Sequence, residues 1–317
     1  MGLRMNEASS KYVDRIAVEK LINEKLRHVH HVPGGAGQAW DEQGWPVLSD
    51  AFPEVSLASD AEISFLSRLP SGDPDNDRAK VLVRPAPDQA GEVVFVHGLY
   101  EDNLKIYDTL LSELVRKGLG VHFLMLPYHY DRTPRQSFFS GEFFWSGDIR
   151  RSVRAYQQAA YDLFDLHQYL RRRSGRPVWI VGFSMGGGIA LTLAAHAPLD
   201  GVFAINPVCN LGELVWKSAL FSTIRSDLQA GGIGYDDVRA RFDRLDPLLA
   251  DRFCTPAERI ALGRSLYDQI NDPAHYDLLV AKWHIRQVRS YRAGHLNVLR
   301  APRLAADIAE FCLGGAA

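Results

Sequence analysis

The sequence predicts an α/β fold: a doubly wound, mostly parallel β-sheet with a helical cap insertion and an N-terminal helical extension. Two observations lead to this fold class. Hydrophobic residues make up 46% of the 317 positions, which is enough for a large buried core. From Glu92 onward, short apolar runs rich in β-branched residues alternate with longer segments of helical periodicity. Because strands buried on both faces read as continuous apolar runs, this alternation indicates a parallel sheet covered by helices on each side.

The first sixty residues are predicted to form an extension ahead of a main domain at residues 61–317. Apolar residues from Ser10 to Val29 recur at helical spacing, which indicates an amphipathic helix. We expect its apolar stripe to pack either on the main domain or on a second copy of the chain, as in a homo-oligomer. A glycine-rich loop is expected from Pro33 to Trp45. Three histidines lack the carboxylates or cysteines of a metal site, so we expect an exposed helix end and no metal: His28, His30 and His31.

Strands of the main domain are expected where short apolar runs are bounded by glycine, proline or polar turn residues. These runs are Glu62–Leu66, Lys80–Val83, Val93–Val96, Val121–Leu126, Val178–Val181, Gly201–Ile205, Ile260–Tyr267 and Val288–Tyr291. Longer segments of helical periodicity are expected to form helices at Leu104–Val115, Arg150–Arg173, Ile189–Ala195, Pro273–Trp283 and Pro302–Cys312. The cap insertion is expected at residues 207–258, with helices at Leu211–Leu228 and Asp236–Leu245.

The strand, turn and helix at residues 177–197 organise the main domain. The turn has the form G-x-S-x-G with Ser184 at its centre, which is the pattern of a nucleophile elbow. So sharp a turn strains the backbone and projects the serine hydroxyl above the sheet. Gly182 and Gly186 have no Cβ, so the strand and the helix can approach closely. The helix also points its N-terminus at the site, where N–H groups would stabilise an oxyanion.

Four segments taken in order, VVFVHG, GFSMGG, an acidic residue after a late strand, and AGH, resemble the α/β-hydrolase superfamily. The resemblance covers about Glu62 to Cys312. Within it, PYHYDRTPRQSFFSGEFF and LVWKSAL resemble a group of bacterial members with a short helical cap. The resemblance implies a serine nucleophile followed along the chain by an acidic residue and then a histidine.

The resemblance identifies His295, in the AGH segment just past the last strand, as the general base for Ser184. Three other histidines follow the serine. His196 lies at the far end of the elbow helix, too remote from Ser184, and we expect surface positions for His275 and His284.

The acid that orients the base is predicted to be Asp268, because it directly follows the strand Ile260–Tyr267 at the carboxyl edge of the sheet. Asp272 is the alternative. It precedes Pro273, and an Asp-Pro pair is typical of a helix start, with Asp as the N-cap and Pro in the first turn. Asp246 is expected in a turn inside the cap insertion.

Two backbone N–H groups are expected to form an oxyanion hole. Met185 follows the nucleophile directly, and Leu99 matches the second donor in the loop after the first core strand. We expect His97 to brace this loop by hydrogen bonding. An apolar substrate pocket above Ser184 is expected to include residues of this loop, of the aromatic segment at 127–148 and of the insertion: His97, Tyr100, Tyr128, Phe144, Trp145 and Trp216. Core packing or a subunit contact is the alternative role for each aromatic residue.

Composition excludes several function classes. The net charge of −2, with both signs interspersed, argues against a nucleic-acid platform. The chain has neither a dinucleotide-binding G-x-G-x-x-G after a strand nor a P-loop, so no cofactor is expected. Three scattered cysteines indicate a reducing compartment, and the chain has no apolar segment long enough to span a membrane. We therefore expect a cytoplasmic protein.

These observations predict a serine hydrolase that cleaves a carboxylic ester of a small-molecule acyl substrate, or a thioester or amide. Two alternatives remain open. An acyltransferase would use the same triad but pass the acyl group to an acceptor other than water. A binding protein on a hydrolase scaffold would need no catalytic residues, so the joint presence of Ser184, Asp268 and His295 argues against it.

Overall fold

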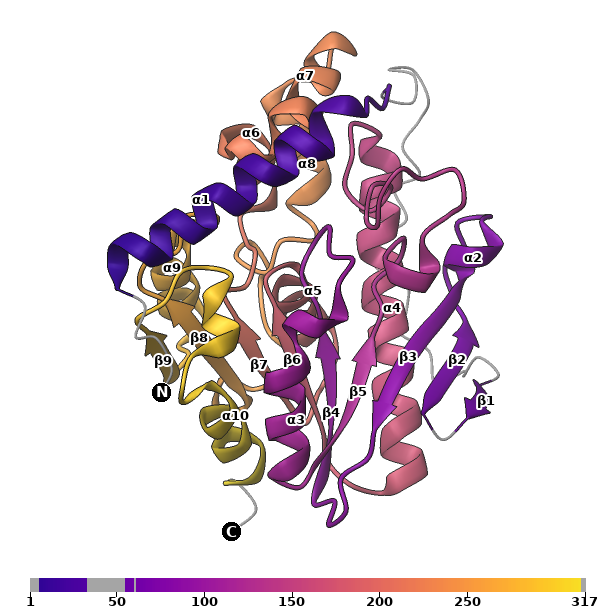
Figure 1. Cartoon of the computed structure of the whole chain (residues 1–317), viewed down its shortest axis with the longest axis vertical. Helices are drawn as coiled ribbons and strands as arrows, with labels where there is room; N and C mark the ends of the chain where they lie inside the picture. The colour runs from indigo at the N-terminus through magenta and orange to yellow at the C-terminus, as the bar shows by residue number, and fades with distance from the viewer. Residues whose placement is uncertain (1–5, 33–54, 60, 315–317) are drawn as a thin grey trace.

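The structure, a computed structural model, describes residues 6–32, 55–59 and 61–314 of the chain. These residues form a nine-stranded sheet with helices on both faces (Figure 1). The strands are β1 (Val55–Ser59), β2 (Glu62–Leu66), β3 (Arg78–Arg84), β4 (Gly91–Val96), β5 (Leu119–Leu124), β6 (Val178–Phe183), β7 (Gly201–Ile205), β8 (Ile260–Ser265) and β9 (Gln287–Tyr291). The glycine-rich loop expected at Pro33–Trp45 lies outside the described residues.

The order of the strands across the sheet is β1-β2-β3-β5-β4-β6-β7-β8-β9. The strands from β5 to β9 in this order are parallel, whereas β1, β2 and β3 form an antiparallel edge, with β3 antiparallel to β5. Because the carboxyl ends of parallel strands meet at one edge, the loops after β4, β6, β7, β8 and β9 gather there. The fold is therefore the doubly wound, mostly parallel sheet that the sequence predicts.

The longer helices are α1 (Glu7–Glu24), α3 (Asp108–Arg116), α4 (Ile149–Ser174), α5 (Met185–His196), α7 (Ser222–Ala230), α8 (Tyr235–Phe242), α9 (Pro273–Trp283) and α10 (Leu304–Leu313). The shorter helices are α2 (Pro74–Asp77) and α6 (Leu211–Lys217), together with 3-10 turns that include η1 (Leu26–His28), η2 (Leu104–Ile106) and η4 (Ala219–Phe221).

Alternate residues of each central strand enter two separate cores. Val94 and Val96 of β4 belong to the core shared with α4 and α5, whereas Val93 and Phe95 belong to the core shared with α3 and α10. All four of these side chains are buried. This two-residue period places one layer of helices on each face of the sheet.

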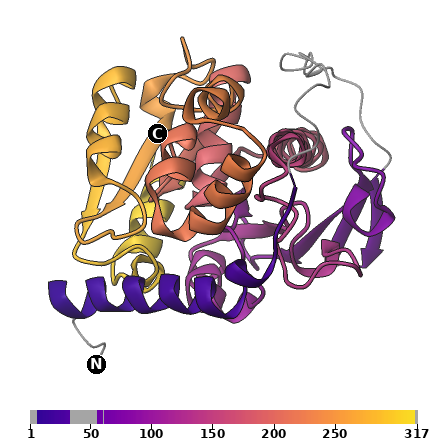
Figure 2. The ribbon, with the colours of Figure 1, turned by 90° about the horizontal axis from the view of Figure 1, so that it is seen from above.

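The N-terminal helix α1 runs obliquely across the upper left of the molecule in Figure 1, from the region of α9 to the cap helices. Seen from above, it lies along one flank of the molecule, beside the cap and the C-terminal elements (Figure 2). Leu21, Ile22 and the buried Leu26 pack against the core of the main domain. Beyond the helix, Lys25 forms an ion pair with Asp102 at 2.7 Å. The helix α1 therefore packs on the main domain of its own chain, which is the first of the two expected packings. A homo-oligomer stays a prediction.

The observed elements differ from the expected ones in several places, chiefly in the following three. The single helix expected at Leu211–Leu228 is divided into α6, η4 and α7, because Ser218 adopts an extended conformation after α6. The helix expected from Leu104 begins with the 3-10 turn η2, and α3 follows. The sequence analysis did not predict β1, which pairs with β2, so the expected boundary at residue 60 falls between two paired strands.

Candidate active site

The turn between β6 and α5 holds Ser184 in a strained backbone conformation, with φ of 52° and ψ of −115°. The Ser184 N–H donates to the carbonyl of Ile205 at 2.8 Å, and the Ser184 carbonyl accepts from Val208 at 3.0 Å. A Cβ added at Gly182, in β6, would lie 2.7 Å from the Cα of Gly187, in α5. The predicted close approach of strand and helix is therefore confirmed.

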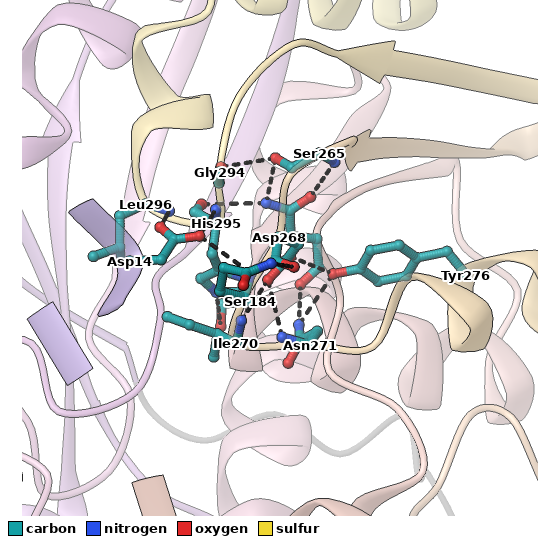
Figure 3. Close-up of polar contacts among 12 residues, drawn as sticks. Asp14, Ser184, Ser265, Asp268, Ile270, Asn271, Tyr276, Gly294, His295 and Leu296 are labelled. Atoms are coloured by element: carbon teal, nitrogen blue, oxygen red, sulfur yellow. Dashed lines mark hydrogen bonds and ion pairs between the residues drawn. The ribbon is translucent and has the colours of Figure 1, made fainter. Parts of the chain in front are cut away.

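The structure brings together the three side chains that the sequence analysis assigned to a triad (Figure 3). His295 Nε2 lies 2.9 Å from Ser184 Oγ, and His295 Nδ1 lies 2.8 Å from Asp268 Oδ2. The three residues follow β6, β8 and β9, at the carboxyl edge of the sheet, and all are buried, with Ser184 8% exposed. A continuous chain of hydrogen bonds thus runs from the serine hydroxyl to a buried carboxylate.

Both carboxylate oxygens of Asp268 accept hydrogen bonds from neighbouring residues. Oδ1 accepts hydrogen bonds from the N–H groups of Ile270 and Asn271, at 2.8 and 2.9 Å. Oδ2, which faces His295, also accepts from the hydroxyl of Tyr276 at 2.8 Å. These donors hold the carboxylate in the orientation that the imidazole requires.

The alternative acids lie elsewhere. Asp272 is the N-cap of α9, and its side chain accepts from the Ala274 N–H at 2.9 Å, as expected of an Asp-Pro pair. Asp246 lies inside the cap insertion, where it accepts from the N–H groups of Leu211 and Leu248. Both carboxylates therefore have structural roles.

The three other histidines downstream of Ser184 also lie away from its hydroxyl. His196 ends α5, and an α-helix of its twelve residues spans about 18 Å from the serine. His275 pairs with Asn210 at 3.1 Å, and His284 ends α9 in a left-handed conformation. Of the four candidates, it is His295 that bonds to the serine.

Electrostatics within the site favour an ion pair between the acid and the base. Burial opposes the charged imidazolium, but the carboxylate of Asp268, with smaller contributions from Asp14 and Glu101, outweighs it and raises the pKa of His295. Burial likewise opposes the Asp268 carboxylate, but His295 and the N–H donors outweigh it and lower the pKa of Asp268. The site is thus arranged to stabilise a protonated His295 beside an ionised Asp268.

The loop after β4 is held from behind by two buried, neutral histidines. His97 donates from Nδ1 to the Gly98 carbonyl at 2.7 Å and accepts from the Leu126 N–H at Nε2, at 3.0 Å. Burial lowers the pKa of His97 well below its ordinary value. His129 accepts from the Tyr100 N–H at 3.1 Å, and burial lowers its pKa to about 3. His97 therefore braces the loop, as expected, and both of its ring nitrogens serve the backbone rather than a substrate pocket.

Among the aromatic residues expected above Ser184, Trp145 joins the aromatic segment to the cap insertion. The Tyr100 hydroxyl donates to the Trp145 carbonyl at 2.6 Å, and the Trp145 ring stacks on Phe242 of α8 at 4.6 Å. The remaining contacts are edge-on or tilted, between Tyr128 and Phe143, Phe144 and His129, and Trp216 and Tyr235.

Two cavities can be compared with the pocket expected above Ser184. One of about 10 Å³ lies between η1, the aromatic segment and the cap, and its lining includes Leu26, Trp145 and Ile224. This volume is smaller than an acyl group, so here Trp145 packs as part of the core. A cavity of about 690 Å³ lies at the far end of α5, with His196 and Arg239 in its lining, and is remote from Ser184.

Sequence reasoning missed the residues that join the strand ends around the triad. Asn206, which follows β7, donates to the His295 carbonyl at 3.2 Å and to Ser265 Oγ at 2.9 Å. Ser265 Oγ in turn donates to the Gly294 carbonyl at 2.9 Å. The one sequence signal for these residues is that each ends a strand or directly follows one.

Two acidic residues near the triad, one buried and one partly buried, were also missed. Asp14 of α1 accepts hydrogen bonds from the loop that carries His295. Glu101 lies in the loop after β4 and accepts from the Tyr130 hydroxyl at 3.3 Å, and burial raises its pKa to about 7. Asp14 is separated from the motifs by most of the chain, so no local pattern could identify it.

Two other kinds of site are absent from the part of the chain that the structure describes. Its histidines, cysteines and acidic residues form no cluster of three or more that could hold a metal ion. None of its helices has both the length and the apolar character needed to cross a membrane.

Comparisons with known proteins agree with this fold. Similar solved structures include acetyl xylan esterase 1 from a Thermoanaerobacterium species, with a TM-score of 0.57 and 16% identity over 94% of this chain and 92% of that one. A soluble variant of monoglyceride lipase from Saccharomyces cerevisiae has a TM-score of 0.53 and 14% identity over 83% and 98% of the two chains. An esterase from Pyrococcus furiosus has a TM-score of 0.52 and 15% identity over 88% and 97%.

A search of curated protein sequences finds no match. The sequence profile of the alpha/beta hydrolase family, however, matches residues 93–309, which run from β4 to α10 and include Ser184, Asp268 and His295. With two thirds of the sequence matched and the sheet order, elbow and loops in the places described above, the chain belongs to the alpha/beta hydrolase family.

Proposed function

We propose that this protein is a serine hydrolase that cleaves a carboxylic ester through an acyl-enzyme on Ser184. The observation that carries the proposal is the buried chain of hydrogen bonds from Ser184 Oγ through His295 to Asp268, at 2.9 and 2.8 Å. A serine hydroxyl is a weak nucleophile unless an adjacent base removes its proton. The chain supplies that base, already oriented by a carboxylate.

In the proposed reaction, His295 Nε2 takes the proton of Ser184 Oγ as the oxygen attacks the carbonyl carbon of the substrate. The bond to the alcohol then breaks, and His295 returns the proton to the leaving oxygen. Water attacks the resulting ester of Ser184, again with His295 as the base, and releases the acid. Asp268 stays ionised throughout and stabilises the imidazolium.

The oxyanion of each tetrahedral intermediate would bind to the N–H groups of Met185 and Leu99. Met185 is the first residue of α5, so its N–H has no acceptor within the helix and lies at the positive end of the helix dipole. On either side of Leu99, the N–H of Gly98 donates to Tyr107 and that of Tyr100 to His129. We therefore assign Leu99 as the donor of this loop. One such donor contributes on the order of 10²- to 10³-fold to kcat.

Esters are favoured over thioesters and amides because the similar structures include esterases and a monoglyceride lipase. The cap helices α6 to α8 pack against the aromatic segment, for example through the stacked rings of Trp145 and Phe242. We infer that they separate to admit a small acyl substrate, as lids do in many enzymes.

The test compares the wild type with Ser184→Ala on a panel of p-nitrophenyl esters of increasing acyl length, with fluorophosphonate labelling in parallel. We expect the wild type to hydrolyse at least one ester and to be labelled on Ser184. The variant should melt like the wild type, lose about 10⁴-fold or more in ester hydrolysis, and resist labelling.

Two outcomes would contradict the proposal. Near-wild-type turnover by Ser184→Ala would exclude the acyl-enzyme. A wild type that neither labels nor hydrolyses any ester would favour a binding protein on a hydrolase scaffold. Acyl transfer is distinguished by adding alcohol or amine acceptors, because partition of the acyl group to them over water would identify a transferase.

A further inference from the structure

Asp14 is a carboxylate in the middle of an N-terminal helix, yet its side chain is fully buried. It faces the loop after β9, where Oδ2 accepts from the His295 N–H at 2.6 Å and Oδ1 accepts from the Leu296 N–H at 3.1 Å (Figure 3). Oδ2 also accepts from the Gln269 N–H at 3.3 Å. Burying a carboxylate is costly unless its oxygens are hydrogen-bonded, and here three backbone donors provide those bonds.

The three donors belong to two different loops. His295 and Leu296 lie in the loop that carries the base, whereas Gln269 directly follows Asp268, the acid. One side chain of α1 therefore links the backbones of both residues that act on Ser184. An N-cap or a surface ion pair would explain neither the burial of Asp14 nor this choice of partners.

A second contact of α1 supports the same loop. Asn297 Nδ2 donates to Ser10 Oγ at 3.1 Å, and Asn297 Oδ1 accepts from the Gly294 N–H at 2.5 Å. A Cβ at Gly294 would lie 2.6 Å from Asp14 Oδ2 and 2.9 Å from the Ser10 carbonyl oxygen. The glycine before His295 thus allows the loop to lie directly against the helix.

The charge of Asp14 acts on the same imidazole. The charged groups that face His295 come from three elements: Asp268 after β8, Asp14 on α1 and Glu101 after β4. All three carboxylates favour the protonated histidine, and Asp14 is the one among them whose hydrogen bonds go to the His295 backbone. Burial raises the pKa of Asp14, while its bonds to the His295 and Leu296 N–H groups oppose that rise.

We propose that Asp14 is a positioning residue for the reaction at Ser184: it fixes the backbone of the base and of the acid loop, and its charge favours the imidazolium that forms during catalysis. This proposal rests on the proposed function. It makes the N-terminal helix a part of the active site.

The test substitutes Asp14→Asn, which keeps the shape of the side chain but removes its charge. The matched control is Glu19→Gln, an exposed carboxylate of the same helix that lies 4.0 Å from Arg15. We expect Asp14→Asn to lower kcat/KM roughly 10- to 100-fold, because small misplacements of a catalytic group have effects of this size. The acidic limb of its kcat/KM profile should move to lower pH, because a negative charge near His295 is lost. Glu19→Gln should match the wild type both in kcat/KM and in the pH dependence of kcat/KM.

NMR titration of the His295 ring gives a readout that does not depend on activity. We expect Asp14→Asn to lower the pKa of His295 and Glu19→Gln to leave it unchanged. If Asp14→Asn does not fold, Asp14→Glu replaces it; because this variant keeps the charge, the pKa of His295 should stay at its wild-type value.

Several results would overturn the proposal. An Asp14→Asn protein with a lower melting temperature but a wild-type pH profile and an unchanged His295 pKa would show a purely structural carboxylate. A fall in the His295 pKa in Asp14→Glu would show that charge is not the cause. If the wild type has no esterase activity, the proposed function fails, and the NMR comparison still decides whether Asp14 acts on His295.

Discussion

At the scale of single residues, the site depends on carboxylates whose surroundings give them different tasks. Asp268 and Asp272 are four positions apart, yet one faces an imidazole and the other caps a helix. Glu101, close to the same histidine, is partly buried and has two tyrosine hydroxyls around it. Each environment leads to a different expected response to removal of the charge.

Asp268→Asn should leave the protein folded but lower kcat by orders of magnitude, because the amide cannot stabilise the imidazolium as the carboxylate does. Asp272→Asn should be mild, since asparagine caps a helix about as well as aspartate. Asp272→Ala should lower the free energy of unfolding by about 1 kcal/mol with little kinetic effect. Steady-state kinetics and thermal melts of the three purified variants check this. An inactive Asp272→Asn beside an active Asp268→Asn would reverse the assignment of the acid.

Glu101 predicts a pH dependence of stability. Burial raises the pKa of Glu101 to about 7 in the folded chain, from about 4.5 for a free side chain. Between these values the folded state binds a proton that the unfolded state has lost, so stability falls as the pH rises through this window. Glu101→Gln removes that titration. We therefore expect the variant to be more stable than the wild type at pH 8, and to lose this advantage at pH 5.

Denaturant melts of the wild type and Glu101→Gln at both pH values measure the difference. Asp108→Asn is a suitable control, because Asp108 is an exposed carboxylate in an ion pair with Arg84. An equal gain at pH 5 and pH 8 would show that the carboxylate of Glu101 does not titrate in this range.

At the scale of elements, the crossing of β6 and α5 sets how closely Ser184 approaches the loop after β4. Gly186, at the start of α5, lies against the carbonyl groups of Val96 and His97 at the end of β4. The Gly186 N–H also donates to the His97 carbonyl at 3.0 Å. The helix that follows Ser184 and the loop that carries Leu99 thus touch through a residue without a side chain.

Gly186→Ala should therefore force the two elements apart. The added methyl group meets backbone atoms, which cannot move aside as a flexible side chain would, so we expect a loss of roughly 1–3 kcal/mol or more in the free energy of unfolding. Gly175→Ala is the control: its φ of 66° is unfavourable for alanine, but its Cβ would meet open space. Strain alone should cost about 1–2 kcal/mol there, without a change in kcat. Chemical melts and ester kinetics of both variants test whether Gly186→Ala forces the two elements apart. Unaltered activity in Gly186→Ala would refute that prediction.

At the scale of the whole molecule, local signals predicted most of the fold. Strand β7 was predicted at its observed bounds, and α4 and α9 within a residue or so, because their apolar patterns are strong and their ends are marked by glycine, proline or capping residues. The elbow was equally predictable, since its chemistry lies in five consecutive residues. The division of the cap helix at Ser218 was not, because tertiary packing there overrides a continuous helical pattern.

Contacts between distant segments account for what the sequence analysis missed at the site. Asn206, Ser265 and Asn271 meet only because β7 and β8 are neighbours in the sheet. Asp14 looks like any polar residue of an amphipathic helix until α1 is placed against the loop after β9. The catalytic roles of Ser184, Asp268 and His295 stay predictions, although their side chains lie where those roles require.

The hydrogen bond from Asp14 to His295 joins residues 281 positions apart. During synthesis, α1 leaves the ribosome well before the loop after β9, against which it docks. Contacts of such sequence separation form slowly, because a long loop has to close before they contribute. We therefore expect α1 to dock late in folding, after the loop that follows β9 has formed.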